Sequence, residues 1–300
     1  MEIWQSERLS AIPWLVHGTA TRVFGSTRYP NEGETDRTQD KRDQFIRSLG
    51  LDPSRLVVSG NTHSNHLVSL PSYYTNLISP PNPNPNLVSP PNPNPNLVSP
   101  PFQGGVRGGY SLVPDCDGLI SSSPNIILGT KTADCLPLFL VDPVSHTIAI
   151  AHAGWKGVMA GIAIEAVHTL ARTSNAKLQG KKLSVNEKLS VNEILVAIGP
   201  SIGACHYAIR DDRRDEMLAR TPFVLKKDFM PTSPNPSLAG GEAYLVDLRA
   251  IVIRQLVSYG ISSSNIDVSA PCTACDPDTF ASYFLSHDAS QGMLSVIALK

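Results

Sequence analysis

Three short apolar runs that follow one another between residues 125 and 151 place the strongest constraint on the fold. They cover residues 125–130, 136–141 and 147–151, are rich in Ile, Leu and Val, and are bounded by turn residues. Runs of this kind predict β-strands. Two further runs of the same character lie at 55–58 and 194–198. The sequence therefore predicts a substantial β-sheet.

Three other segments show the spacing of amphipathic helices. These helices are predicted at 41–49, 157–172 and 246–259. Within the second segment, one helical face would carry the apolar side chains of Val158, Ile162, Ala166 and Leu170. Strands and helices together predict a mixed α and β protein.

A stretch rich in proline and asparagine interrupts this pattern. Eleven of the 25 prolines lie between Pro71 and Pro101, and the decamer NLVSPPNPNP has near copies on either side. Such sequence predicts an extended, solvated loop rather than a packed unit. Loop insertions are expected at about 71–109, at about 179–193, where KLSVNE is duplicated, and at about 231–242. The remaining roughly 240 residues suit a single domain.

Charge and hydropathy patterning exclude two classes of partner. The chain has 25 Lys+Arg against 26 Asp+Glu, a formal net charge of −1. Binding along a phosphate backbone needs an excess of basic residues, so nucleic acid is not expected as a partner. A membrane partner is not expected either, because no apolar run reaches the roughly 20 residues of a spanning helix. The first residues lack the basic and apolar regions of a secretion signal, so we expect a cytoplasmic protein.

His63, Cys135 and His152 are the strongest candidates for a reactive site. Each lies where a predicted strand meets a turn, a position from which a side chain can project into a cleft. Two imidazoles and a thiolate suit zinc, and three protein ligands leave a fourth position open for water or substrate. A solitary His or Cys at a strand end is more often structural, and spacing alone does not separate the two interpretations.

Four sequence motifs add a reason to group these residues. They are TADCLP around Cys135, AHAGWKG around His152, GPSIGACHY at 199–207 and SAPCTACDPDTFASYF at 269–284. With HGTATR at 17–22 and GMLSVIAL at 292–299, they occur in the order found in the laccase-domain (YfiH-like) polyphenol oxidoreductase family, whose members are also described as purine nucleoside phosphorylases. The sequence resembles this family over nearly the whole chain outside the insertions.

The resemblance implies a fold, an activity and a metal site. The fold would be a layered α/β sandwich with mixed sheets in a single domain. The activity would be phosphorolysis of purine nucleosides such as adenosine, inosine and S-methyl-5′-thioadenosine, with adenosine deaminase as a side activity. Purine nucleosides and phosphate would then be the partners. The catalytic zinc would be bound by His63, Cys135 and His152, and copper is the alternative metal because such a site binds Cu²⁺ more tightly.

The chain departs from the family pattern at two of its motifs. The family's Gln-Val-His-Gly is NTHS at 61–64 here, which leaves His66 as a competing ligand. The family's Gly-Trp-Arg-Gly is GWKG at 154–157 here. Lysine keeps the positive charge but lacks the planar fork with which arginine binds phosphate through two hydrogen bonds.

Five further residues are assigned candidate roles near the substrate. Arg22 and Lys156 are candidate phosphate-binding cations, with a solvated surface charge as the alternative for each. His17 is a candidate acid or base, with a structural hydrogen bond as the alternative. Asp134 is a candidate to orient a metal ligand or a water molecule. Asp117 resembles an acidic turn residue of the family, and capping of a turn is its alternative.

Cys272 and Cys275 form a C-x-x-C pair. No second pair stands at zinc-finger spacing, so a structural zinc ribbon is not predicted. The resemblance places Cys272 near the substrate site, and Cys275 is expected to be an inert thiol. The chain has five cysteines, an odd number that does not suggest a disulfide framework.

Two rival enzyme classes remain open. A copper-dependent, laccase-like polyphenol oxidase would need more ligands, arranged in paired His motifs, than the one visible His/Cys group supplies. A metal-free hydrolase would use Cys135 as nucleophile and His152 as base. A non-enzymatic role in which the Pro/Asn insertion recruits a partner lacks a P-x-x-P segment with a flanking Arg. Stoichiometric metal is the observation that separates the zinc enzyme from the metal-free hydrolase.

Overall fold

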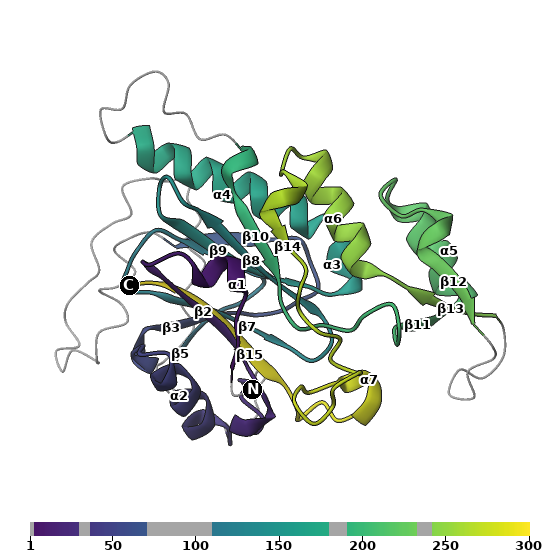
Figure 1. Ribbon diagram of the computed structural model, residues 1–300, viewed down its shortest axis with the longest axis horizontal. Helices are drawn as coiled ribbons and strands as arrows, with labels where there is room; N and C mark the ends of the chain where they lie inside the picture. Colours follow the sequence, from purple (N-terminus) through teal and green to yellow (C-terminus); the bar gives the residue numbers. More distant parts are fainter. Residues whose placement is uncertain (1–2, 30–36, 71–109, 180–190, 233–241) are drawn as a thin grey trace.

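The apolar runs lie at the centres of two six-stranded sheets that face each other (Figure 1). The computed structural model describes residues 3–29, 37–70, 110–179, 191–232 and 242–300. All five predicted strands are confirmed, as are the helices predicted at 41–49 and 246–259. The insertions expected at about 71–109, 179–193 and 231–242 lie mostly outside the described residues.

The strands divide among three sheets. The first sheet has the order β1 (Ile3–Trp4), β2 (Leu15–Ala20), β15 (Met293–Leu299), β7 (Ile127–Thr132), β3 (Leu56–Ser59), β5 (Tyr110–Val113). The second has the order β14 (Ile266–Asp267), β10 (Leu195–Ile198), β8 (Leu136–Asp142), β9 (Thr147–Ala153), β6 (Gly118–Ser121), β4 (Leu67–Leu70). A small third sheet has the order β11 (Ala208–Arg210), β13 (Ala243–Val246), β12 (Phe229–Thr232).

Helices cover the outer face of each large sheet. Figure 1 shows α2 (Gln39–Ser48) below the first sheet, and α4 (Ile162–Gln179) and α6 (Leu248–Ser258) above the second. The remaining α-helices among the described residues are α1 (Glu7–Ser10), α3 (Trp155–Met159), α5 (Asp211–Arg220) and α7 (Tyr283–Ser286). None of the helices in the described segments combines the length and apolar character needed to cross a membrane.

Strand β8 shows how the sequence creates these layers. Successive side chains of a strand point to opposite faces. Phe139 and Val141 therefore join the apolar cluster between the two sheets, whereas Leu138 and Leu140 join the cluster beneath the helices. Because both faces are covered, every residue of β8 and β9 is buried. The result is a layered α/β domain with mixed sheets, as the family resemblance implies: β8 and β9 are antiparallel, whereas β3 is parallel to both β5 and β7.

The helix predicted at 157–172 differs from the expectation at its start. The chain forms two helices there, α3 and α4, separated at Ala160 and Gly161. Gly161 has φ +81, a left-handed conformation that ends the first helix and that residues with a Cβ rarely adopt. The apolar face is nevertheless as predicted, since Val158, Ile162 and Leu170 are fully buried.

Two neighbouring connections cross from the first sheet to the second at the same end of the strands. One joins β3 to β4 and the other joins β5 to β6. Strands β3 and β5 are parallel neighbours in the first sheet, and β4 and β6 are parallel neighbours in the second. The two crossing segments therefore run side by side, and both carry polar residues of the site described next.

Candidate metal centre and adjoining cavity

The three predicted ligands come together at one end of the two central strands of the second sheet. Cys135 immediately precedes β8, and His152 lies near the end of β9. These strands are antiparallel with Leu136 opposite Ala153, so the beginning of one strand lies beside the end of the other. His63 lies in the crossing segment between β3 and β4. The ligand atoms of His63, Cys135 and His152 all lie within 4.8 Å of one another.

Gly154 leaves the space into which these ligands point. A Cβ at this position would lie 2.9 Å from Cδ2 of His63, 3.2 Å from Sγ of Cys135 and 3.4 Å from Cε1 of His152. A side chain there would occupy the space between the three ligands. Two imidazoles and one thiolate converging on a gap kept open by glycine fit a zinc ion with an open fourth position.

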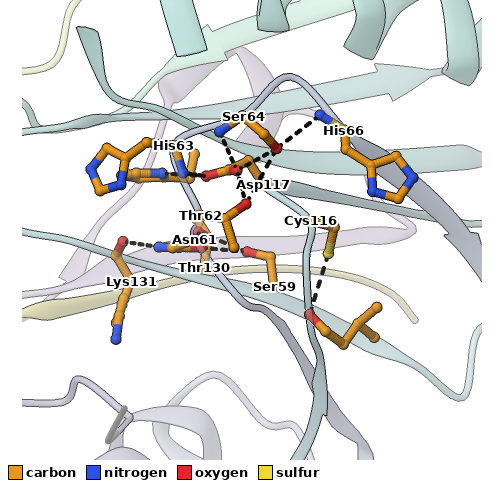
Figure 2. A network of polar contacts seen from close by, with 12 residues as sticks. Ser59, Asn61, Thr62, His63, Ser64, His66, Cys116, Asp117, Thr130 and Lys131 are labelled. Carbon is orange, nitrogen blue, oxygen red and sulfur yellow. Dashed lines mark hydrogen bonds and ion pairs between the residues drawn. The ribbon is translucent and has the colours of Figure 1, made fainter. Parts of the chain in front are cut away.

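Asp117 joins the two histidine-bearing segments (Figure 2). It is fully buried and comes from the crossing segment between β5 and β6. Its Oδ1 lies 2.9 Å from Nδ1 of His152 and accepts a 2.9 Å hydrogen bond from the backbone N–H of His63. Since Nδ1 of His152 is engaged by the carboxylate, Nε2 is the ring nitrogen free for a metal. A carboxylate that orients a metal-binding histidine in this way is a recurrent feature of zinc sites.

The second oxygen of Asp117 fixes the loop around His63. Oδ2 accepts hydrogen bonds from the backbone N–H of Ser64 at 2.7 Å, from the Ser64 hydroxyl at 2.7 Å and from the Thr62 hydroxyl at 2.9 Å. Ser64 stands where the related motif has glycine, and here its side chain adds a hydrogen bond. His63 itself adopts φ +62, a left-handed conformation uncommon outside glycine. Asp117 therefore holds a strained backbone that carries a candidate ligand.

A second network behind this loop holds Asn61, which also adopts a left-handed conformation, with φ +58. Its Nδ2 donates to the backbone oxygen of Lys131 at 2.7 Å, and its Oδ1 accepts from the hydroxyls of Ser59 and Thr130 (Figure 2). The side chain of Asn61 thus connects the loop to β3 and β7. The loop bearing His63 is anchored on both sides of the ligand.

The charges at the site favour a thiolate at Cys135. Burial alone would raise the pKa of this thiol, but the charge and hydrogen bond of His152 outweigh it and lower the pKa to about 6. Burial likewise opposes protonation of His152, yet Cys135 and Asp117 together raise its pKa to about 9. Burial also opposes ionisation of Asp117, and its bonds to His152 and Ser64 nevertheless hold its pKa well below the usual range. A thiolate is both the metal-binding and the nucleophilic form of cysteine.

A cavity of about 630 Å³ adjoins the centre, a size typical of small-molecule sites. His63 and Cys135 form part of its wall, so the candidate metal centre faces this space. The other residues that line the cavity are Ala133, Asp134, Trp155, Ile202, Tyr207, Ala208, Ile209, Arg210, Asp212, Arg213, Leu248, Tyr283, Phe284 and His287. Aromatic rings and two arginines thus lie around one opening.

Arg213 is the most notable cation of the cavity. Its guanidinium carbon lies 4.5 Å from the centre of the Trp155 ring, a cation–π contact. In the described part of the chain it makes no ion pair with a carboxylate. Tyr207 lies against it, and burial is the main reason that the pKa of this phenol is raised to about 12. Tyr207 therefore stays protonated at neutral pH and can donate a hydrogen bond.

The other candidates from the sequence lie in several places. Asp134 lines the cavity, but its carboxylate accepts 2.6 Å hydrogen bonds from the Thr273 hydroxyl and the Phe284 backbone, so the carboxylate that contacts His152 is that of Asp117. His66 is exposed, its Nδ1 lies 2.8 Å from the backbone oxygen of Asp115, and it is not part of the ligand group.

The two cations named from the sequence lie outside the wall of this cavity. Arg22 and Lys156 are both exposed. Lys156 has its Nζ 5.8 Å from the centre of the Trp155 ring, and Trp155 does line the cavity. Cys272 lies with three other metal-binding side chains in a separate group, away from Cys135. That Arg22, Lys156 and Cys272 contact the substrate remains a prediction.

His17 lies inside the protein on β2. Its Nε2 accepts a 2.9 Å hydrogen bond from the backbone N–H of Ser6, and its ring meets Phe139 edge-on. Burial lowers the pKa of His17 to about 4, although Asp267 acts in the opposite direction. This geometry corresponds to the structural alternative considered for the residue.

The buried His17 predicts a measurable pH dependence of stability. Because its pKa is lower in the folded than in the unfolded state, the unfolded state binds the proton first as the pH falls below about 6.5. The free energy of unfolding is thus expected to fall by about 3 kcal/mol more in wild type than in His17→Gln between pH 6.5 and 4. Gln keeps a hydrogen-bond acceptor for Ser6 but does not titrate. Urea unfolding of both proteins across this pH range measures the difference. The same dependence of the free energy of unfolding on pH in wild type and in His17→Gln would contradict the prediction.

Five residues of the cavity wall are not among the candidates from the sequence: Arg213, Tyr207, Tyr283, Phe284 and His287. Tyr207, Tyr283 and Phe284 lie inside the motifs GPSIGACHY and SAPCTACDPDTFASYF, and His287 lies three residues after the second motif. Aromatic residues in a motif are more often core residues, and only the cavity shows that these face a common space.

Comparison with known proteins places the chain among a group with several named activities. Residues 26–300 match the family model described as multi-copper polyphenol oxidoreductase laccase. The chain is 31% identical over 185 residues to the purine nucleoside phosphorylase YlmD of Geobacillus stearothermophilus, covering 62% of this chain and 60% of that protein. It is 32% identical over 166 residues to the adenosine deaminase RL5 of an unknown prokaryotic organism, covering 55% of each chain. The matched part thus spans less than two thirds of these relatives.

The fold is similar to that of solved structures. The crystal structure of the hypothetical protein YfiH of Bacillus licheniformis aligns with a TM-score of 0.68 at 24% sequence identity, covering 95% of this chain and 93% of that chain. At this identity the likeness shows a common fold alone.

Proposed function

The chain belongs to the multi-copper polyphenol oxidoreductase laccase family, and we propose that within it the protein is a zinc-dependent purine nucleoside phosphorylase. The observation that carries the proposal is the composition of a single cavity. It brings the face of a His/Cys centre together with aromatic rings and with the guanidinium of Arg213, which has no carboxylate partner in the described part of the chain. A metal, a flat base and a phosphate would each find a matching surface there.

The substrate would be bound by complementary parts of the wall. Purine rings stack well on aromatic side chains, and Trp155, Tyr207, Tyr283 and Phe284 offer such surfaces. Phosphate is recognised by arginine through charge-assisted hydrogen bonds, which Arg210 and Arg213 can supply. Adenosine, inosine and S-methyl-5′-thioadenosine share the purine and the ribose that these groups would contact.

The proposed reaction exchanges one bond at the sugar. A phosphate oxygen forms a bond to C1′ while the C1′–N9 bond breaks, and its electron pair leaves with the purine. The purine takes up a proton, so the products are the free base and ribose 1-phosphate. Arginine would hold phosphate next to the sugar, which lowers the entropic cost of bringing the two reactants together. Its positive charge would also offset the negative charge of the phosphate.

The residues of the centre would bind zinc and keep it oriented. His63, Cys135 and His152 are the proposed ligands, and Asp117 fixes the orientation of His152 and the loop of His63. Zinc bound there would supply Lewis acidity. Tyr207, protonated at neutral pH, would donate a hydrogen bond into the cavity. We propose adenosine deamination as a side activity, because the chain is also similar to a protein named as an adenosine deaminase.

The test is an assay of adenosine turnover with and without inorganic phosphate. The expected products are adenine and ribose 1-phosphate in equal amounts, formed only when phosphate is present. Adenine and free ribose in the absence of phosphate would indicate the Cys–His hydrolase instead. Inosine as the main product would make deamination the principal reaction. Oxygen consumption with a phenol, but no nucleoside turnover, would favour the laccase-like oxidase.

In the same assay, Arg213→Ala is expected to raise the KM for phosphate by about tenfold or more, because a charge-assisted hydrogen bond is worth about 1.5–3 kcal/mol. Arg220→Ala is the matched control, since Arg220 ends the same helix and pairs with Glu216 at 2.7 Å. If the KM for phosphate responds instead to Arg22→Ala or Lys156→Ala, the cation named from the sequence holds the phosphate and the role of Arg213 is refuted.

A further inference from the structure

A second group of metal-binding side chains lies outside the catalytic centre. Cys205 and His206 follow β10, and Cys272 and Cys275 follow β14. Strands β10 and β14 are parallel neighbours, so the segments that leave their carboxyl ends meet at the same edge of the sheet. A β-bridge between Ser201 and Cys272 continues this alignment beyond the strands. Residues about 66 positions apart in the chain thereby become neighbours.

The four ligand atoms have the spacing of a tetrahedral site. Sγ of Cys205 lies 3.4 Å from Sγ of Cys275. Nδ1 of His206 lies 3.3 Å from Sγ of Cys205, 3.5 Å from that of Cys275 and 3.8 Å from that of Cys272. In tetrahedral zinc sites, bond lengths of about 2.3 Å to sulfur and about 2.0–2.1 Å to nitrogen place neighbouring sulfurs about 3.8 Å apart and sulfur and nitrogen about 3.6 Å apart. All four atoms lie within 4.8 Å of one another, and the cysteines are free thiols.

The backbone around these side chains is arranged to receive thiolates. The N–H of Gly203 donates to Sγ of Cys272 at 3.1 Å, and the N–H of Cys275 donates to the backbone oxygen of Cys272 at 3.1 Å. A Cβ on Gly203 would lie 3.3 Å from Sγ of Cys205 and 3.2 Å from Cβ of Cys272. The glycine thus allows the two sulfur-bearing segments to approach, and hydrogen bonds to the ligands orient them as around known metal sites.

Arg249 supplies a positive charge and ties the two segments together. Its guanidinium donates to the backbone oxygens of Ser201, Ala270 and Pro271 at 2.6–2.7 Å and to the Ser201 hydroxyl at 3.0 Å. It lies close enough to Cys205, Cys272 and Cys275 for its charge to act on each of them. Three thiolates, one neutral imidazole and Zn²⁺ carry a net charge of −1, which the guanidinium offsets.

We propose that Cys205, His206, Cys272 and Cys275 bind a structural zinc ion with four protein ligands. Such a closed Cys₃His set is typical of structural zinc, in contrast to the three-ligand centre of His63, Cys135 and His152. The sequence does not predict the site because the second pair is a Cys-His dipeptide far from zinc-finger spacing. The proposal is independent of the proposed activity.

The second site would fix one wall of the cavity. Ile202 and Tyr207, on either side of the Cys205–His206 pair, both line that space. Thr273, next to Cys272, donates to Asp134 beside the other centre, and the N–H of Ile202 donates to the backbone oxygen of Asp134 at 2.9 Å. A metal that holds both segments therefore positions the cavity wall without contacting the substrate.

The test counts zinc in variants that separate the two sites. Each protein is dialysed against metal-free buffer and its zinc is measured by elemental analysis. The double variant His63→Ala/His152→Ala is expected to retain about one zinc per chain, and addition of Cys275→Ser is expected to remove it. Cys116→Ser added to the same double variant is the control, because this buried thiol contacts the backbone of Val113 outside both groups. No zinc in the double variant, or zinc retained after Cys275→Ser, overturns the proposal.

A measurement on the wild-type protein guards against variants that fail to fold. Cys205 and Cys275 are exposed, so iodoacetamide can reach both when they are free thiols. Bound to zinc, they are expected to react at least about tenfold more slowly until a chelator is added, as followed by peptide mass spectrometry. Equal rates before and after the chelator, or a disulfide between Cys205 and Cys275, would refute the site. Neither result bears on nucleoside turnover, so the two proposals succeed or fail separately.

Discussion

Cys135→Ala is expected to lower kcat/KM for phosphate-dependent adenine release by about a thousandfold or more. Cys135 is one of the three proposed zinc ligands, and it also lines the cavity. Its loss removes the only anionic ligand of the centre, and Lewis-acid stabilisation by a metal is worth several kcal/mol, each 1.36 kcal/mol being tenfold in rate. The measurement is steady-state kinetics together with elemental analysis of the same preparation.

The metal content distinguishes the reasons for such a loss. Zinc is expected to fall by about one equivalent per chain while the protein stays folded, because the site made by Cys205, His206, Cys272 and Cys275 is separate. Cys116→Ala, at a thiol outside both groups, controls for the simple loss of a cysteine. A wild-type kcat/KM for phosphate-dependent adenine release in Cys135→Ala would contradict the zinc mechanism. Zinc-independent turnover in wild type that disappears in the variant would point to the thiol hydrolase.

Asp117→Ala is expected to lower the free energy of unfolding by about 3–5 kcal/mol, the usual cost of removing one partner from a buried charged network. Its carboxylate is fully buried and holds His152, the backbone of His63 and both donors of Ser64. Without it, several buried donors lose their acceptor and the left-handed loop of His63 loses its support. Zinc affinity at the centre is expected to fall by about 10- to 100-fold as well.

Denaturant unfolding and competition with a chromophoric chelator measure these two effects. Asp115→Asn is a suitable control, because Asp115 is exposed, lies two residues earlier and has φ +52, which asparagine tolerates. A variant at Asp117 that keeps both wild-type stability and wild-type zinc affinity would show that the contacts of this carboxylate drawn in Figure 2 do not stabilise the centre.

Local patterns in the sequence suffice for the strands and for the candidate ligands. The position of His63, Cys135 and His152 at strand ends, together with their motifs, names a group whose ligand atoms do meet. The contacts of Asp117 cannot be predicted from local patterns. Its contact with His152 exists because β6 and β9 are antiparallel neighbours with Gly118 opposite Ala151, and its contact with His63 exists because the β3–β4 and β5–β6 connections cross between the sheets side by side. Such long-range pairing leaves no trace in local spacing.

Long-range pairing in the fold also explains why other contacts of the site could not be predicted from the sequence. Cys205 meets Cys275 only because β10 and β14 are parallel neighbours. Arg213 reaches the cavity from α5, a helix that lies between β11 and β12 of the small third sheet, and its sequence neighbourhood, DDRRDE, resembles an ordinary solvated surface. Asp134 directly precedes Cys135, yet its left-handed backbone, with φ +89, leaves its carboxylate bonded to Thr273 and Phe284.

The crossing connections also decide where the chain can be altered by protein engineering. The segments that carry His63 and Asp117 leave the carboxyl ends of β3 and β5. Leu70 is the last residue of β4, and Tyr110 is the first residue of β5. Both of these residues therefore lie at the ends of their strands that are farther from His63 and Asp117. An affinity tag or a reporter domain inserted between Leu70 and Tyr110 would therefore join the described fold at the strand ends that lie away from His63 and Asp117. The two ends of the strands can be redesigned independently, one for assay and immobilisation and the other for substrate choice.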